Sequence, residues 1–500
     1  MAADAEDGEA NAHAHSWPGE REPSRWDVDE ANTVPAPTFL ARFEAALTHA
    51  EASLVAEQRT SRYRTLYGID HLATAQLPTT SCTYPLALLS NGPVLPPDDE
   101  LVDLQNTYRQ SFERHIFVRD FKLSDMLGSS NRQPPYLQLA VACVAAVFSS
   151  PASDGSSLSA SEDLFAAGAS VWRVVLETDN REARNVQAVV AAMLLCTYGT
   201  LSGESVTQRT ASGLLSNVIT ISRRVHLTDF RYPSNEPLPA EPRFAAKNSL
   251  ISYMVLVDTL HSLHLGTAPC YSVYELFFNL PRSGHPFRTV YHSILYGHDP
   301  PPDTANSEDP LVLIIALLTD IVYTQICHST DALSSAKTIP FRPMSSTSQY
   351  TRSSDAFNGA LGRWKQHFGN CVEPDILSIF HFARLVLLVP GLYSVTDCTM
   401  VVNLPGMSSE AAEVAWIVLD DAEKALEKPD KSMVRWLPIV LYTSGLVVAG
   451  FNLLNPRLGG LRSLVMFEHA LSRLPWPCSR RMAENLRQLR EGPQQRRNAI

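Results

Sequence analysis

The 500-residue chain carries 41 Lys and Arg against 52 Asp and Glu, a formal net charge of −11, and 45% of its residues are hydrophobic. This composition is typical of a globular protein and excludes collagen-like and low-complexity classes. Because an acidic chain attracts phosphates poorly, it also argues against binding of nucleic acid over the whole surface.

The N-terminal segment 1–35 predicts a disordered acidic tail. Nine acidic residues and two arginines fall within its first 30 positions, with few aliphatic side chains to bury. An acidic tail that contains Trp17 and Trp26 would fit an activation segment. A solvated tail is the simpler interpretation.

Residues 36–99 predict a helical N-terminal segment followed by a linker. Apolar residues follow the a/d spacing of two heptads, and Glu57 then breaks the pattern. A short packing helix is therefore favoured, with a dimerisation seam as the alternative. Gly92-Pro93 and Pro96-Pro97 interrupt helical structure after it. The apolar stripe consists of Leu40, Phe43, Leu47, Ala50 and Leu54.

From about residue 100 the chain shows apolar stripes at helical spacing and no clear period-2 alternation, which predicts an all-α, large multi-helical domain. One helix ends at Gly266, a plausible C-terminal glycine. The expected divisions are a core part at 100–298, a linker-rich segment with one helix at 299–355, C-terminal helices of the same body at 356–476 and a basic tail at 477–500.

The second part of the linker-rich segment, residues 329–355, contains eight serines between Ser329 and Ser354. This composition predicts a flexible loop. A phosphorylated loop is the alternative interpretation.

Residues 436–454 form a stretch of 19 residues without a charge, within the length that a bilayer requires. The stretch also contains Pro438, Gly445 and Asn452. A buried core helix of a large helical protein is therefore favoured over a membrane anchor, and no membrane contact is expected.

The eight cysteines do not have the spacing of a zinc module. The closest pair, Cys371 and Cys398, lies 27 residues apart, and there is no CxxC motif. Zinc fingers and zinc clusters need cysteine pairs within one tight turn. The chain is therefore not expected to hold a zinc DNA-binding module of its own.

No motif predicts a catalytic, cofactor-binding or metal site. The set Asp258-x-x-His261-x-x-His264 spans about 120° and ~9 Å of rise on a helix, so all three cannot easily bind one ion. His261 and His264 could bind one as a pair with ligands from outside the helix. Packed, hydrogen-bonded histidines are the expectation. Asp420-Asp421 does not continue into the D-D-x-x-D motif of a terpenoid-type enzyme. A helical-pocket enzyme of unknown reaction remains only as an alternative.

The C-terminal segment 477–500 is rich in arginine. The pairs Arg480-Arg481 and Arg496-Arg497 are separated by 14 residues and loosely resemble a bipartite nuclear import signal. Weak contact with phosphates is a second interpretation, and a solvated, frayed terminus is the simplest one.

Short segments in a fixed order between residues 105 and 285 resemble the fungal-specific transcription factor domain, the middle homology region of fungal zinc-type regulators. The C-terminal third is similar more loosely, through Leu437-Pro438-Ile439 and Ser444-Gly445-Leu446. The segments are Asn106–Phe112, His115–Val118, Tyr136–Ala142, Phe165–Gly168, Gln187–Val190, Leu195–Gly199, Ser202-Gly203, Arg223–Leu227, Asp258–Ser262, Leu265–Pro269 and Leu280-Pro281.

This resemblance implies a nuclear transcriptional regulator and not an enzyme. It implies regulation of a metabolic or secondary-metabolite gene set, and no cofactor is expected. The expected partners are a DNA-bound transcription factor or the transcription machinery, with a homodimer as a further option and little or no direct sequence-specific DNA binding. The Asp position of the family corresponds to Asp258, for which we expect a structural hydrogen-bonding or ion-pairing role.

Overall fold

A computed structural model describes residues 96–113, 115, 117–121, 134–149, 156–178, 181–228, 242–297, 306–329, 347–395, 398–402, 404–428, 434–455 and 460–498. Within these ranges the chain is helical and contains no strand, only an isolated β-bridge between Asn279 and Pro286. The all-α prediction is therefore confirmed. The predicted tail 1–35 and the heptad stripe at Leu40 lie outside the described residues.

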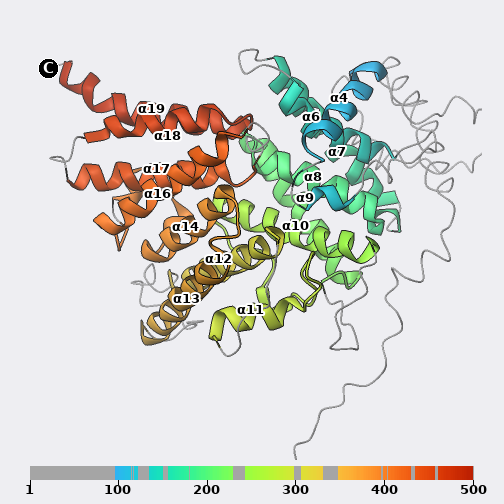
Figure 1. Cartoon of the computed structure of the whole chain (residues 1–500). Helices are drawn as coiled ribbons and strands as arrows, with labels where there is room; N and C mark the ends of the chain where they lie inside the picture. The colour runs from blue at the N-terminus through green and yellow to red at the C-terminus, as the bar shows by residue number, and fades with distance from the viewer. Residues whose placement is uncertain are drawn as a thin grey trace, which may run out of the picture.

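The helices form two groups that meet at central helices (Figure 1). The first group is α4 (Asp98–Ser111), α6 (Pro135–Ser149), α7 (Ser156–Thr178), α8 (Val186–Thr200) and α9 (Ser205–Arg224). The central and lower helices are α10 (Pro242–Leu265), α11 (Phe287–Tyr296), α12 (Glu308–Ser329), α13 (Thr347–Phe368) and α14 (Pro374–Leu388). The C-terminal group is α15 (Cys398–Val401), α16 (Ser409–Leu426), α17 (Leu437–Leu454), α18 (Leu464–Ser472) and α19 (Pro477–Asn498). Short 3-10 turns include η3 (Val118–Phe121) and η5 (Val273–Glu275).

Side-chain patterning decides which helices are internal. Helix α8 is apolar on all sides, and every side chain from Ala188 to Thr200 is buried. Helix α9 is amphipathic and buries only the stripe that includes Leu214, Val218 and Ile221. A helix without a polar face needs neighbours on every side, so α8 occupies the interior and α9 covers it.

Helix α10 ends where the sequence predicts. Gly266 follows its last residue with a φ of +65°, a left-handed conformation in which a side chain is strained. The Thr267 amide donates to the Ser262 carbonyl and closes the helix end. A Cβ at Gly266 would also lie 3.1 Å from the Ser394 Cα, so this glycine permits close packing as well.

The C-terminal helices pack directly on the N-terminal group. The Trp476 ring is fully buried and makes edge contacts with Phe112 and Phe148, at centroid distances of 6.2 and 5.5 Å. The Cys478 amide donates to the Leu201 carbonyl at 2.9 Å. One hydrophobic core thus runs from α4 to α19 without interruption.

Two helices occupy segments in which the sequence did not predict them. Helix α13 begins at Thr347, inside the 329–355 segment predicted as a linker. Helix α19 occupies most of the 477–500 segment predicted as a basic tail, and it buries Met482 and Leu486 against its neighbours. In both segments polar and basic residues on the outer face concealed a helix that is stabilised by tertiary packing.

The N-terminal boundary also differs slightly. Helix α4 begins at Asp98, and Pro97 is its N-cap residue. Asp98, Asp99 and Glu100 occupy the first turn, where negative charge interacts favourably with the helix dipole. The Pro-Pro-Asp-Asp sequence therefore starts a helix.

Candidate functional site

Asp258 on α10 is a buried structural acceptor. Its two carboxylate oxygens accept hydrogen bonds from the Cys270 amide at 3.0 Å and the Tyr271 amide at 2.8 Å. Burial raises the pKa of Asp258 to about 6, and the two hydrogen bonds from backbone amides counteract part of that increase. The carboxylate thus holds the loop after α10 in place, which confirms the expected hydrogen-bonding role.

His261 and His264 are hydrogen-bonded within the same helical layer. The His261 ring nitrogens lie 3.0 Å from the Thr200 hydroxyl and 2.8 Å from the Ser212 hydroxyl. The His264 Nε2 atom lies 2.8 Å from Gln208 Nε2, which donates to it. Burial lowers the pKa of both histidines to about 4, so both rings are neutral at neutral pH. They link α8 and α9 to α10, as expected for packed histidines.

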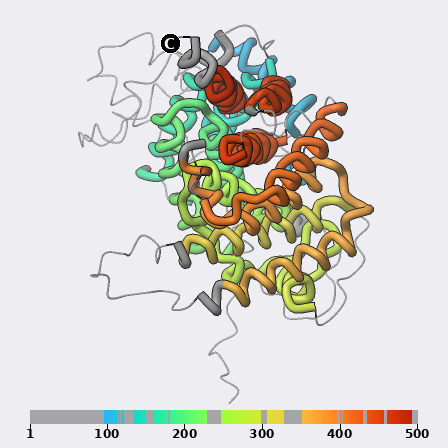
Figure 2. The backbone as a smooth tube through the Cα atoms, turned by 90° about the vertical axis from the view of Figure 1, so that its left-hand side faces the viewer, coloured from blue at the N-terminus to red at the C-terminus, as the bar shows by residue number. Residues whose placement is uncertain are grey.

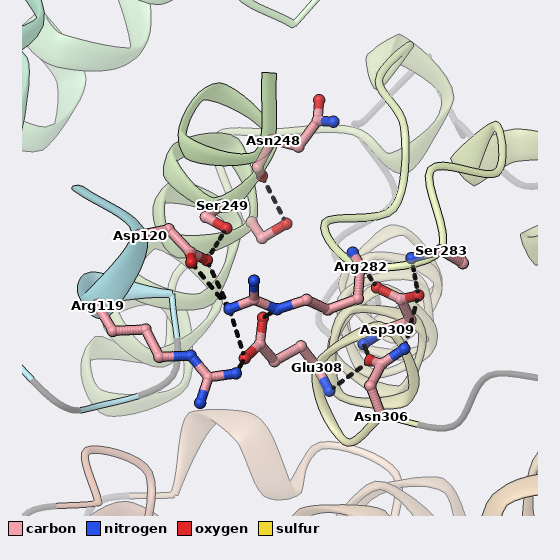
Figure 3. Close-up of polar contacts among 10 residues, drawn as sticks. Arg119, Asp120, Asn248, Ser249, Arg282, Ser283, Asn306, Glu308 and Asp309 are labelled. Atoms are coloured by element: carbon pink, nitrogen blue, oxygen red, sulfur yellow. Dashed lines mark hydrogen bonds and ion pairs between the residues drawn. The ribbon is translucent and has the colours of Figure 1, made fainter. Parts of the chain in front are cut away.

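A larger polar network joins η3, α10, the loop after η5 and the start of α12 (Figure 3). The Arg282 guanidinium donates to Glu308 at 2.5 and 3.0 Å and to Asp120 at 2.8 Å. Arg119 donates to the same Glu308 carboxylate. Ser249 on α10 donates to Asp120 at 2.5 Å. Four segments that are distant in sequence therefore meet at one pair of guanidinium groups.

The start of α12 is organised around the same network. The Asn306 side-chain oxygen accepts from the Glu308 and Asp309 amides, both at 3.0 Å, and so caps the helix. The Asp309 carboxylate accepts from the amides of Arg282 and Ser283 at 3.0 and 2.9 Å. These bonds fix the backbone that presents the Arg282 side chain.

The charges of this network are satisfied internally. The two guanidinium groups pair with the carboxylates of Asp120 and Glu308, and the Asp309 carboxylate is bound by backbone amides (Figure 3). Burial and the neighbouring Arg282 lower the pKa of Arg119. Glu308 and Asp309 are almost completely buried and hold several donors each, so neither is available as a base toward a substrate. The arrangement is suited to fixing four segments and not to catalysis.

The local sequence did not predict this network. Arg282 directly follows the Leu280-Pro281 segment of the resemblance, and Glu308 and Asp309 lie in the segment 299–355 that was expected to be rich in linkers. The one local signal was Asn306 followed by two acidic residues ahead of an apolar run, the pattern of a capped helix. The pairing of Arg282 with Asp120, 162 positions earlier, has no local signal.

The two adjacent acids of α16 do not form a catalytic pair. Asp420 is exposed and pairs with Lys424 at 2.5 Å. Asp421 is buried, lies 3.7 Å from the His381 Nε2 atom, and has a pKa raised to about 6 by burial. Burial lowers the pKa of His381 to about 4. The two carboxylates therefore lie on different faces of the helix and in different environments.

Of the arginines predicted to act in nuclear import, two lie at the start of α19. Arg480 is half-buried, and Arg481 is exposed and donates to the Gly203 carbonyl. Arg496 and Arg497 belong to the same helix near its end, and their side chains lie outside the described residues. The 477–500 segment therefore presents these positions on a helix and not on a frayed terminus.

Helix α17, the predicted core helix, is one of two helices in the described ranges that are long and apolar enough to cross a membrane. The other is α12, and in both cases 78% of the apolar window is buried inside the protein. All side chains of α17 from Leu437 to Gly450 are buried. This burial is typical of a core helix.

Comparison with known proteins gives one match. The model of the fungal specific transcription factor domain matches residues 104–310. No curated protein and no solved structure was found to match the chain. The matched range begins in α4 and ends in the first turn of α12, so it contains Asp258, both α10 histidines and the Arg282 network. Over residues 104–310 the chain is therefore similar to the fungal specific transcription factor domain.

Proposed function

We propose that the chain is a nuclear transcriptional regulator that acts through protein interactions and is not an enzyme. The observation that carries this proposal is the match of residues 104–310 to the fungal specific transcription factor domain. Its partners are a DNA-bound transcription factor or the transcription machinery. The regulated genes belong to a metabolic or secondary-metabolite set.

The chemistry of the interior supports a regulatory body over an enzyme. Asp258, His261 and the Arg282 network are occupied by internal hydrogen bonds. In the described ranges no three His, Cys, Asp or Glu side chains are grouped so as to hold a metal ion. Because these polar groups hold helices to one another, the outer faces of the helices are the surface on which partners would bind.

Tethering of the chain to DNA tests the proposal. The full chain is fused to a heterologous DNA-binding domain whose site lies upstream of a reporter gene. We expect reporter transcription to change several-fold relative to the DNA-binding domain alone, because the fusion replaces the partner that brings the chain to DNA. An unchanged reporter would contradict the regulatory role.

The purified chain is expected to show no sequence preference for DNA. Specific readout needs a scaffold that holds side chains against base edges, and the cysteine spacing provides no zinc scaffold. The measurement is selection from random duplexes at roughly 150 mM salt, near physiological ionic strength. Enrichment of one sequence by the chain alone would contradict recruitment through a partner.

Nuclear import is expected to depend on the four arginines of α19. Replacing Arg480, Arg481, Arg496 and Arg497 with Gln should lower the nuclear-to-cytoplasmic ratio of a fluorescent fusion several-fold, because importers recognise clustered positive charge. Truncation after Pro477 is unsuitable, since it removes the buried face of α19. The matched control replaces the exposed Arg173 and Arg224. A wild-type fusion excluded from nuclei would refute the nuclear assignment.

A further inference from the structure

Three exposed tyrosines belong to η5, α11 and α12, which lie next to one another in the fold. Tyr274 is 53% exposed, Tyr296 is 51% exposed and Tyr323 is 45% exposed. Every other tyrosine whose side chain the structure describes is buried. Figures 1 and 2 both show α11 at the lower edge of the molecule, away from the C-terminal helices at the top. Large exposed side chains that collect in one place indicate an interaction site.

The carboxylate of Asp320 on α12 lies beside these tyrosines. Its Oδ2 atom accepts a hydrogen bond from the buried Tyr291 hydroxyl of α11 at 2.5 Å. Partial burial, the negative charge of Asp320 and the neighbouring Tyr296 raise the pKa of Tyr274 to about 12, so these three groups lie within interaction distance. Tyr323 follows Asp320 by three positions in α12, which places both on one face of that helix. We call Asp320, Tyr274, Tyr296 and Tyr323 together the Asp320 cage.

One oxygen of Asp320 remains available in this arrangement. The residue is only 8% exposed, and its Oδ1 atom accepts no hydrogen bond from the part of the chain that the structure describes. Oδ1 is not one of the unpartnered polar atoms that are sealed from solvent, so it reaches the surface. Burial raises the pKa of Asp320 to about 6, and no neighbouring cation lowers it. Asp320 is therefore largely ionised at neutral pH and has no counter-charge among the described residues.

The basic side chains around the cage are engaged elsewhere. The Arg288 guanidinium lies 4.0 Å from the centre of the Phe277 ring and donates to the Tyr274 backbone carbonyl at 3.0 Å. The His292 ring meets the Tyr296 ring edge-on at a centroid distance of 5.6 Å. Burial and the nearby Arg288 lower the pKa of His292, so its ring is neutral at neutral pH. Neither side chain neutralises the carboxylate.

We propose that the Asp320 cage binds a methylated ammonium group, carried by a lysine side chain of a partner or by a free small amine. Tyrosine ring faces attract cations, and aromatic cages of this kind recognise methylated ammonium groups. The N–H that a dimethylammonium keeps can donate a charge-assisted hydrogen bond to the Asp320 Oδ1 atom. A trimethylammonium has no N–H to donate. An unmethylated ammonium is strongly hydrated and has no methyl groups to contact the rings. The dimethylated form should therefore bind most tightly.

Titration of the full chain with N-acetyl-Nε,Nε-dimethyl-lysine amide, followed by saturation transfer to the methyl protons of this probe in NMR, tests the proposal. We expect saturable binding, with a Kd several-fold lower than those of the trimethylated and unmethylated derivatives. Asp320→Asn should raise the Kd at least about tenfold, because hydrogen bonds to charged groups are the stronger ones. Tyr274→Leu should raise it about twofold to fivefold by removing one ring face, whereas Tyr274→Phe keeps the ring and should bind as the wild type does.

Asp420→Asn is the matched control for Asp320→Asn. It removes the same charge from a position on α16 that is 64% exposed, so it should leave the Kd unchanged. Absence of binding would overturn the proposal, as would equal affinity for the dimethylated and unmethylated probes. Wild-type affinity in Asp320→Asn or in Tyr274→Leu would also overturn it. If thermal melting shows that Asp320→Asn does not fold, the comparison of Leu with Phe at the exposed Tyr274 decides the outcome.

A second titration identifies the source of the ligand. N,N-dimethylethanolamine carries the dimethylammonium group without the lysine chain. An equal Kd for this amine and for the lysine derivative would support the proposal with a free small amine as the ligand. A several-fold higher Kd for the amine would support it with a methylated protein side chain. The inference does not rest on the proposed function, and failure of the tethering experiment leaves it unaffected.

Discussion

Replacing Arg282 with Ala is expected to lower the free energy of unfolding by about 3–5 kcal/mol, the range found when one partner of a buried ion pair is removed. Arg282 is the main partner of Glu308, whose side chain is only 2% exposed, and it also pairs with Asp120. Without Arg282, the Glu308 carboxylate keeps only Arg119 as a charged partner (Figure 3). Urea unfolding followed by far-ultraviolet circular dichroism measures the loss.

The control for this variant is Arg384→Ala. Arg384 forms an ion pair of similar length with Glu410, at 2.7 Å, but the two side chains are 40% and 55% exposed. Solvent screens such a pair, so the expected loss is about 1 kcal/mol or less. Equal losses in the two variants would contradict the structural role of the Arg282 network. If Arg282→Ala does not fold, Arg282→Lys keeps the charge but loses the bidentate geometry and should show an intermediate loss.

Replacing Trp476 with Ala is expected to cost about 3–5 kcal/mol, as found for large aromatic side chains removed from cores. The effect should extend beyond the C-terminal helices, because the Trp476 ring packs against Phe112 at the end of α4 and Phe148 in α6. Hydrogen exchange measured by mass spectrometry should show lower protection in α4 and α6 as well as in α18 and α19.

Trp416→Ala is the matched control for Trp476→Ala. Trp416 is 37% exposed, so its removal leaves a smaller cavity and a smaller loss of stability. If Trp476→Ala loosened only α17 to α19 and left the exchange of α4 and α6 unchanged, the C-terminal helices would be independent of the matched domain. That result would contradict the continuous core.

Most features that the sequence predicts correctly depend on residues close together in the chain. The apolar stripes predict helices because periodicity of 3.6 residues is a local property. The end of α10 at Gly266 follows from the conformational freedom of one glycine. The role of Asp258 came from a resemblance whose motif lies within one helix and the loop after it, and its two amide donors lie only 12 and 13 positions away.

The features that required the folded chain depend on contacts between distant segments. Nothing near Arg282 indicates that it meets Asp120. The two residues lie 162 positions apart, and only the packing of α10 and α12 brings them together. The 477–500 segment is a second example of a feature that the local sequence does not indicate. Its composition resembles a solvated tail, yet Met482 and Leu486 are buried because α17 and α18 offer an apolar surface that α19 can cover. Local composition therefore established the class of fold, whereas long-range burial decided which polar residues hold it together and which segments belong to the core.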